Sequence, residues 1–596
     1  MNIDSILKTS ITRAFKELFD YKVQPVDIKL QPTNREFEGS HTFIVFPFLK
    51  ITKKRPEETA ELLGSFLKKS SGIVSSYNVV KGFLNLVIND RTWLESFEFD
   101  YNTPSWEQIK PKRQKIMVEY SSPNTNKPLH LGHLRNNFLG YSVSEILKAT
   151  GNHVEKVTLV NDRGIHICKS MVAYRKYGNG ETPESSGIKG DHLAGKYYVK
   201  FDQEYKKQIE QMIREGMAKE DAAKNAPLML EAQDYLIKWE KKEHEVIDLW
   251  KKMNGWVYDG FNATYQTIGV DFDKTYYESE TYILGRDIVT EGLEKGLFYK
   301  KPDGSVWVDL SDEGLDEKLL LRSDGTSVYM TQDLGTADLK YRESGFDQSL
   351  YVVGNEQNYH FDVLFMILRK LGRPYADGLH HLSYGMVDLP SGKMKSREGT
   401  VVDADDLVDE MVETARIKTA ELGKIDDFSE KEAEQLYRVL ALGALKYFLL
   451  KIDPKKRMMF NPEDSIQFQG HTGPFIQYTY ARISAILRKA SELNIDLDQP
   501  HVNLEWDLHE TERDLIATLN EYNQDMTEAA ENFAPSIIAN YCFELAKNYN
   551  RFYTEVSIFK ENNMDRRNFR VSLSSLTART IKHGMSLLGI DVPERM

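Results

Sequence analysis

The sequence predicts an α/β protein in three parts, with a parallel sheet in the middle, an N-terminal α+β unit and a C-terminal all-α unit. Short apolar runs alternate with helical stretches over residues 112–428, as in a parallel sheet. Residues 1–107 combine amphipathic helices with strand-like runs, and residues 430–596 show helical periods alone. A chain of 596 residues is long enough for three domains.

The composition excludes several protein classes. The chain has 77 Lys and Arg against 90 Asp and Glu, a formal net charge of −13, which argues against a uniformly basic nucleic-acid-binding coat. Its two cysteines, Cys168 and Cys542, lie far apart and offer neither a disulfide framework nor a cysteine zinc site. No stretch approaches the roughly 20 apolar residues of a membrane helix, and no signal peptide opens the chain. We therefore expect a soluble, cytoplasmic protein without a structural metal.

The N-terminal unit should contain two helices and two strands. Ile3, Leu7 and Ile11 recur at helical spacing, and residues 58–68 give a second amphipathic helix. Strand-like runs cover residues 42–49 and 82–88. Basic residues cluster beside them, and either a solvated loop or a nucleic-acid contact would explain this cluster: Lys50, Lys53, Lys54 and Arg55.

The central region should place a polar motif at the end of its first strand. Strands are predicted at residues 116–119, 154–160, 349–354 and 381–389. The first is followed by a helix that ends at Gly151, and between strand and helix lies the segment Glu119-Tyr-Ser-Ser-Pro-Asn124-Thr-Asn-Lys127-Pro-Leu-His130-Leu-Gly-His133. A strand end beside a helix N-terminus is where an α/β sheet binds its ligand and where a phosphate finds unpaired N–H groups.

The two histidines of this segment share one face of the first helical turn. His130 and His133 can polarise a polyphosphate, while Gly132 allows an adenine ring to lie against the backbone. A chance surface pair or half of a metal site would look the same. Metal is disfavoured because no nearby cysteine or pair of acidic residues completes a tetrahedral set.

A second polar loop, Gly392-Lys393-Met394-Lys395-Ser396-Arg397, follows the last predicted strand. Such a loop can lay lysine and main-chain N–H groups on phosphates. Alone, it would be better explained as an ordinary solvated turn. Together, the two motifs resemble the signatures of the class I aminoacyl-tRNA synthetases.

Further segments narrow the resemblance to the arginyl-tRNA synthetases, from about residue 115 to the end and more weakly through residues 1–107. The closing Val592-Pro-Glu-Arg-Met596 is also similar to that family's C-terminus. Four segments in the right order carry the resemblance: the motif from Glu119 to His133, Tyr329-Met-Thr-Gln-Asp333-Leu, Val353-Gly-Asn-Glu-Gln357-Asn-Tyr-His360-Phe and Tyr478-Thr-Tyr-Ala-Arg482-Ile-Ser-Ala-Ile-Leu-Arg488.

The family resemblance implies a domain plan and a set of partners. It implies a Rossmann-like catalytic domain at residues 112–428 with a helical insertion at about 180–265, an anticodon-binding domain at 430–596 and a tRNA contact in residues 1–107. The insertion is expected to pack near the acceptor end of the tRNA. The substrates would be L-arginine, ATP with Mg2+ and the tRNA for arginine, handled by a monomer.

The ATP-binding residues implied by the resemblance are His130, Gly132, His133, Lys393, Met394, Lys395 and Ser396. Of these, His130, His133 and Lys393 would be catalytic, together with Lys127. The general class I pattern has a lysine where this chain has Ser396. Arginyl enzymes that lack that lysine usually carry one just before the first motif, and Lys127 stands there. One ammonium must reach the phosphates, and either of two converging loops can supply it.

The resemblance also implies how arginine is bound. Tyr329 and Asp333 lie four positions apart and face the same way on a helix, where they would hold the guanidinium. Glu119 would be a further acceptor. A hydrogen bond on a helix surface is the alternative for this pair. The substrate backbone would meet Ser122, Asn124, His133 and Gln357.

The rest of the catalytic region and the C-terminal domain are less specific. A turn at residues 161–166 is similar to a family segment that usually has glutamine where this chain has His166, so the role of His166 stays open. C-terminal helices are predicted at residues 436–449, 478–493 and 522–547. The resemblance implies tRNA contacts at Tyr478, Arg482 and Met596.

Two other classes of protein are possible on the same motifs. A small nucleotidyltransferase would keep both histidines but would not need the C-terminal helical domain. A non-catalytic RNA-binding relative could lose the histidines, Lys127 and Lys393, all of which this chain has.

Overall fold

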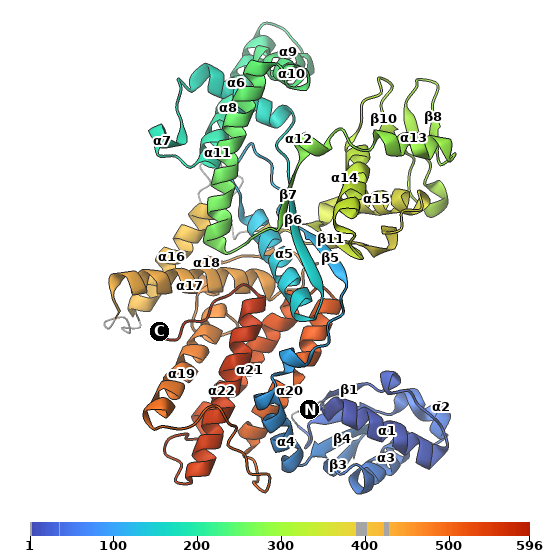
Figure 1. Ribbon diagram of the computed structural model, residues 1–596, viewed down its shortest axis with the longest axis vertical. Helices are drawn as coiled ribbons and strands as arrows, with labels where there is room; N and C mark the ends of the chain where they lie inside the picture. Colours follow the sequence, from blue (N-terminus) through green and yellow to red (C-terminus); the bar gives the residue numbers. More distant parts are fainter. Residues whose placement is uncertain (1–2, 35, 389–401, 422–427) are drawn as a thin grey trace.

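The computed structural model describes residues 3–34, 36–388, 402–421 and 428–596. At its centre lies a sheet of five parallel strands in the order β12-β11-β5-β6-β7 (Figure 1). The strands are β5 (Lys115–Glu119), β6 (His153–Val160), β7 (Lys274–Tyr277), β11 (Gln348–Gly354) and β12 (Leu379–Tyr384). This sheet, together with a separate α+β unit before it and a helical domain after it, confirms the predicted fold class.

Both faces of the sheet are covered, as in other parallel sheets. On β5, Ile116 and Val118 belong to a core shared with α5 (Leu131–Ala149) and with helices of the C-terminal domain. Met117 points the other way, into a core with α14 (Tyr329–Ser344) and α15 (Asn358–Lys370). The end of β5 is therefore held between two packed layers.

A helical unit stands between β6 and β7, at the top of Figure 1. Its own core includes Phe201, Leu228 and Trp239. The helices are α6 (Ile165–Tyr177), α7 (Pro183–Ser186), α8 (Gly190–Arg214), α9 (Lys219–Asn225), α10 (Pro227–Glu240) and α11 (His244–Ile268).

A smaller group of helices and strands lies between β7 and β11 in the chain. It contains α12 (Glu278–Thr281), α13 (Arg286–Glu294) and an antiparallel sheet of β8 (Phe298–Lys300), β9 (Val306–Val308) and β10 (Lys318–Leu321). The chain then enters α14, whose inner face includes the buried Leu334 and Ala337.

The N-terminal unit packs α1 (Ile3–Phe19) and α3 (Pro56–Ser70) on an antiparallel sheet. Its strands are β1 (Leu30–Pro32), β2 (His41–Ile44), β4 (Phe83–Ile88) and β3 (Val74–Val80) in that order. The strand predicted at residues 42–49 ends early, because the chain turns through a 3-10 helix at Phe46–Phe48, with Pro47 inside it, into α2 (Leu49–Thr52). The unit docks through α4 (Asp90–Asn102) on α20, where Arg513 Nε lies 2.7 Å from Asp90 Oδ1.

The C-terminal domain is helical, with α16 (Ala404–Glu421) and α17 (Glu430–Leu450) leading into it. Its long helices are α19 (Gly473–Glu492), α20 (Glu510–Glu531), α21 (Pro535–Glu555) and α22 (Met564–Leu587). The single helix predicted at residues 522–547 is wrong. The chain breaks at Phe533, which has a left-handed φ of 50°, and Pro535, which lacks an N–H, begins a new helix.

The strand predicted at residues 381–389 is also divided. β12 ends at Tyr384, and β13 (Val387–Asp388) pairs instead with β14 (Met458–Met459). Gly385 marks the break, because a Cβ there would lie 2.7 Å from the backbone of Lys456 and Arg457. Within the described residues, no helix is long and apolar enough to cross a membrane.

Candidate active site

The loop after β5 turns sharply across the carboxyl ends of β5 and β6. Ser121 and Ser122 both have left-handed backbones, with φ of 71° and 46°. The Ser122 N–H donates to Thr158 Oγ1 at 3.2 Å, and Asn161 Nδ2 donates to the Ser122 carbonyl at 3.3 Å. Two adjacent non-glycine residues in this region store strain, and such strain collects at functional sites.

The two histidines form a capping box at the start of α5. Gly132 N–H donates to His130 Nδ1 and His130 N–H donates to His133 Nδ1, both at 3.1 Å, and the ring centroids lie 3.9 Å apart. Because each Nδ1 accepts, each neutral ring carries its proton on Nε2. Two N–H donors therefore sit at a helix N-terminus, which favours an anion.

Burial keeps both rings neutral. Burial, followed by the charge of Lys127, lowers the pKa of His130 to about 4. Burial, His130 and Lys127 hold the pKa of His133 well below its usual value. Lys127 is thus close enough for its charge to lower the pKa of both rings.

The second predicted ATP-binding segment cannot be placed. Lys393, Met394, Lys395 and Ser396 lie outside the described residues. The chain on either side is tied to the start of α5, since Leu131 N–H donates to the Val402 carbonyl at 3.0 Å and Arg135 donates to the Met386 carbonyl at 3.3 Å.

A cavity of about 190 Å³, here called the cation cavity, collects three of the residues predicted to bind arginine. Glu119, Asp333 and Gln357 line it, together with Lys340 and His360. His360 Nε2 lies 2.6 Å from Asp333 Oδ2, and Lys340 pairs with Glu119 Oε2. Two carboxylates in one small cavity are suited to a cation.

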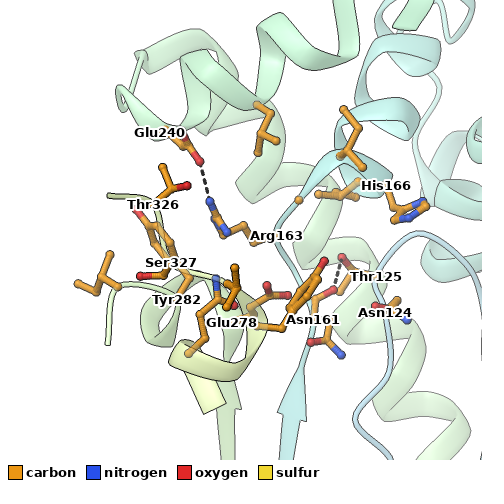
Figure 2. A pocket seen from close by; sticks show the side chains of 18 of the residues that line it. Asn124, Thr125, Asn161, Arg163, His166, Glu240, Glu278, Tyr282, Thr326 and Ser327 are labelled. Atoms are coloured by element: carbon orange, nitrogen blue, oxygen red, sulfur yellow. Dashed lines mark hydrogen bonds and ion pairs between the residues drawn. The ribbon is translucent and has the colours of Figure 1, made fainter. Parts of the chain in front are cut away.

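A second cavity of about 870 Å³ opens between the sheet, the helical insertion and the start of α14 (Figure 2). Asn124, Tyr329 and His166 line it. Tyr329 is 76% exposed and lines this second cavity, whereas Asp333, one helical turn later, lines the cation cavity. Ser122 and His133 line neither cavity within the described chain.

Charged groups in the second cavity were not foreseen from sequence. Arg163 lies 2.6 Å from Glu240 Oε1 and 3.9 Å from the ring centre of Tyr282. Burial raises the pKa of Glu278 to about 7, with Arg163 opposing and Asp162 adding to the shift. This carboxyl group can therefore exchange a proton near neutral pH.

A third cavity, of about 1000 Å³, lies in the C-terminal domain and is lined by all three residues predicted to contact tRNA, Tyr478, Arg482 and Met596. The Arg482 guanidinium carbon lies 5.0 Å from the ring centres of both Tyr478 and Tyr553. Basic and aromatic side chains together are typical of a site for unpaired bases.

One cluster of potential metal ligands occurs in the described chain, at Asp191, His192 and Asp405. Lys189 Nζ already lies 2.6 Å from Asp405 Oδ2 and 3.2 Å from Asp191 Oδ2. The lysine ammonium already lies between the two carboxylates where a cation would bind.

Sequence reasoning missed Lys340, although a signal for it existed. Lys340 follows Asp333 by seven positions, two helical turns, and so shares its face of α14. Glu278 and Arg163 carried no comparable signal, because their approach depends on how the insertion folds over the sheet.

Comparisons with known proteins agree with this architecture. A family model described as "tRNA synthetases class I (R), catalytic domain" matches residues 102–461. Models described as "DALR anticodon binding domain" and "Arginyl tRNA synthetase N terminal domain" match residues 476–596 and 5–88.

Relatives that match this chain over their whole length share the same name. A protein of Amoebophilus asiaticus named "Arginine--tRNA ligase" is 59% identical over the whole of both chains, and one of Bacteroides thetaiotaomicron with the same name is 54% identical over the same share. The solved Thermus thermophilus arginyl-tRNA synthetase superposes with a TM-score of 0.78 at 26% identity over 99% of each chain. The Plasmodium falciparum enzyme, at 20% identity and a TM-score of 0.77 over 100% of this chain and 99% of its own, supports the fold. The chain belongs to the arginyl-tRNA synthetases, a family of class I aminoacyl-tRNA synthetases.

Proposed function

We propose that the protein activates L-arginine with ATP to form arginyl-adenylate and transfers the arginine to the 3′-terminal adenosine of its tRNA. The observation that carries this proposal is the cation cavity at the end of β5, whose Glu119 precedes His130 at the anion-favouring start of α5 by eleven positions. A guanidinium and a triphosphate are the substrates that these two neighbouring features suit.

Glu119 and Asp333 would bind the guanidinium, with Gln357 at the same cavity. Each carboxylate already holds one partner, Lys340 and His360 respectively. A planar fork of N–H donors can bridge two carboxylates, which a point-like ammonium does less well. The rest of the substrate would then meet Tyr329, Asn124, Ser122 and His133, with Tyr329 and Asn124 on the side of the second cavity.

His130, His133 and Lys127 would stabilise the reacting phosphates, together with Lys393. The neutral histidines donate from Nε2, and Lys127 provides the charge. Mg2+ would enter with ATP as part of the substrate. The protein side chains contribute positioning and electrostatics rather than covalent chemistry.

The tRNA would reach both ends of the molecule. Its anticodon would bind at the cavity of Tyr478, Arg482 and Met596, and its acceptor end would approach through the second cavity, beneath the helical insertion. Residues 1–107 would add a further contact. We further propose that the protein acts as a monomer in the cytoplasm.

Pyrophosphate exchange tests the proposal. Each amino acid is supplied in turn, with and without total tRNA. Arginine should be the one amino acid that supports exchange, and it should do so only when tRNA is present. Exchange driven by a different amino acid would overturn the proposal, as would no exchange with arginine and tRNA. Charging of tRNA with labelled arginine separates this activity from that of a small nucleotidyltransferase.

A further inference from the structure

A buried lysine lines the cavity that is proposed to bind a cation. Lys340 is 2% exposed, and its ammonium donates to Glu119 Oε2. It shares the lining with Asp333 and His360. A buried charge is costly unless it is paired, and a positive group beside a cationic substrate weakens the binding of that substrate. The position of Lys340 therefore calls for an explanation.

The surrounding structure fixes Lys340 in place. Asp333, Thr336 and Lys340 recur along one face of α14 and all line the cavity. The Lys340 Nζ lies 5.2 Å from the ring centre of Tyr351 and 5.6 Å from that of Tyr276. In the parallel pairing of β5 with β11, Tyr351 stands directly beside Glu119. The ammonium is thus held by one carboxylate and two aromatic rings.

The charges that line the cavity can be counted. Glu119 and Asp333 contribute −1 each and Lys340 contributes +1. His360 Nε2–H donates to Asp333 Oδ2, because a carboxylate can only accept, and the ring is counted here as uncharged. The sum is −1, which matches one guanidinium.

The same contacts leave one oxygen on each carboxylate. Lys340 engages Oε2 of Glu119 and His360 engages Oδ2 of Asp333, so Oε1 and Oδ1 are the atoms not committed to these two partners. Two oxygens from different groups suit the planar fork of a guanidinium.

We propose that Lys340 is a specificity-determining residue that sets the charge of the cation cavity to −1 and holds Glu119 so that the cavity takes one guanidinium. This inference rests on the proposed function. It predicts that the preference for arginine over citrulline, its uncharged analogue, follows the net charge of the cavity.

Four forms of the full-length protein test this charge rule. The wild type has a cavity charge of −1, Lys340→Met gives −2, Glu119→Gln gives 0, and the double variant Lys340→Met/Glu119→Gln returns to −1. The ratio of the citrulline inhibition constant to the arginine KM is measured by tRNA charging. Because it is a ratio, it cancels a general loss of active protein.

The preference for arginine should change by about tenfold for each unit of cavity charge. Lys340→Met should raise it, Glu119→Gln should lower it, and the double variant should match the wild type. Rescue of Glu119→Gln by a second substitution is a result that a merely structural lysine would not give.

The matched control is Lys274→Met. Lys274 Nζ of β7 lies 2.6 Å from Glu343 Oε2 of α14, and both side chains of this ion pair are more than a third exposed and lie outside the cavity. The Lys274→Met variant should prefer arginine over citrulline by the same factor as the wild type. If Glu119→Gln and the double variant show the same preference, the inference is wrong. A wild type that does not charge tRNA with arginine contradicts the proposed function instead.

Discussion

His192 of α8 and Asp405 of α16 form an ion pair that joins the helical insertion to the chain beside the predicted ATP site, with His192 Nε2 3.1 Å from Asp405 Oδ2. Thr264 Oγ1 donates to the other oxygen of Asp405 at 3.0 Å. One residue away, Ala404 N–H donates to the Leu129 carbonyl at 3.0 Å. The pair therefore supports the backbone that carries His130.

The ion pair should stabilise this junction mainly in mildly acidic solution. Burial would raise the pKa of Asp405, but hydrogen bonds from His192 and Lys189 lower it to about 2. Burial would lower the pKa of His192, but the hydrogen bond to Asp405 and the charges of Asp191 and Asp403 raise it, against Lys189. Asp405 loses its contribution as the pH falls from 3.8 through about 2, and His192 loses its own as the pH rises above 6.5 through its raised pKa.

Asp405→Asn should lower hydrogen-exchange protection of the Leu131 and Ala404 amides by about tenfold near pH 5.5. The ratio of wild-type to variant protection should be smaller near pH 8.5, where His192 has lost its proton. The exposed neighbour provides the control variant, Asp406→Asn, which should leave the protection unchanged. A ratio that does not vary with pH would exclude a contribution from His192.

Lys127→Met should slow formation of arginyl-adenylate by about a hundredfold, equivalent to about 2.7 kcal/mol. The reason is that the neutral rings of His130 and His133 retain no positive charge for the phosphates. Single-turnover measurements should show the arginine KM nearly unchanged. Lys206→Met, which removes an exposed ammonium from α8, is the control. An unchanged rate in Lys127→Met would contradict the role of Lys127.

The rate of activation should show no titration of an imidazole near pH 6.5. Burial first, with Lys127 adding, lowers the pKa of His130 to about 4, so the ring stays neutral down to that pH. As the pH falls through this value, Nδ1 is protonated and the capping box opens, so activity should fall. Rapid-quench measurements from pH 4.5 to 8 test this expectation, and an acid limb centred at pH 6.5 would refute it.

Arg482→Met should raise the KM for tRNA by about tenfold or more while leaving the KM values for arginine and ATP unchanged. Arg482 stands between the rings of Tyr478 and Tyr553 and lines the C-terminal cavity. Lys547→Met, which breaks an exposed pair with Glu544 on α21, serves as the control. An equal effect of both substitutions would indicate nonspecific attraction to the tRNA backbone.

Gly385→Ala should lower the melting temperature and the activity together. The added Cβ would meet the backbone of Lys456 and Arg457 at 2.7 Å, and neither segment can move without breaking the pairing of β13 with β14. Gly255→Ala in α11 is the matched change, because nothing lies within 4 Å of its Cβ position. That variant should melt at the same temperature or higher. Calorimetry distinguishes the two outcomes.

Local signals were sufficient for much of the fold. The apolar run before Glu119 and the capping residues around His130 define β5 and α5 because both depend on neighbours in the chain. Breaks were harder to predict. The end of β12 depends on the backbone of residues 456 and 457, and the gap before Pro535 interrupts an otherwise continuous helical period.

The sequence by itself determined the family resemblance, the class of fold and the two histidines at a helix start, because these depend on residue types at fixed spacing. Only the tertiary structure decided that Asp333 and Glu119 share a cavity while Tyr329 faces another, and that Lys340 neutralises Glu119. Glu119 and Lys340 are 221 positions apart, and only the packing of α14 against the sheet brings their charges together. Charge balance within a cavity is therefore a property of the folded chain, since burial and distance set its energy.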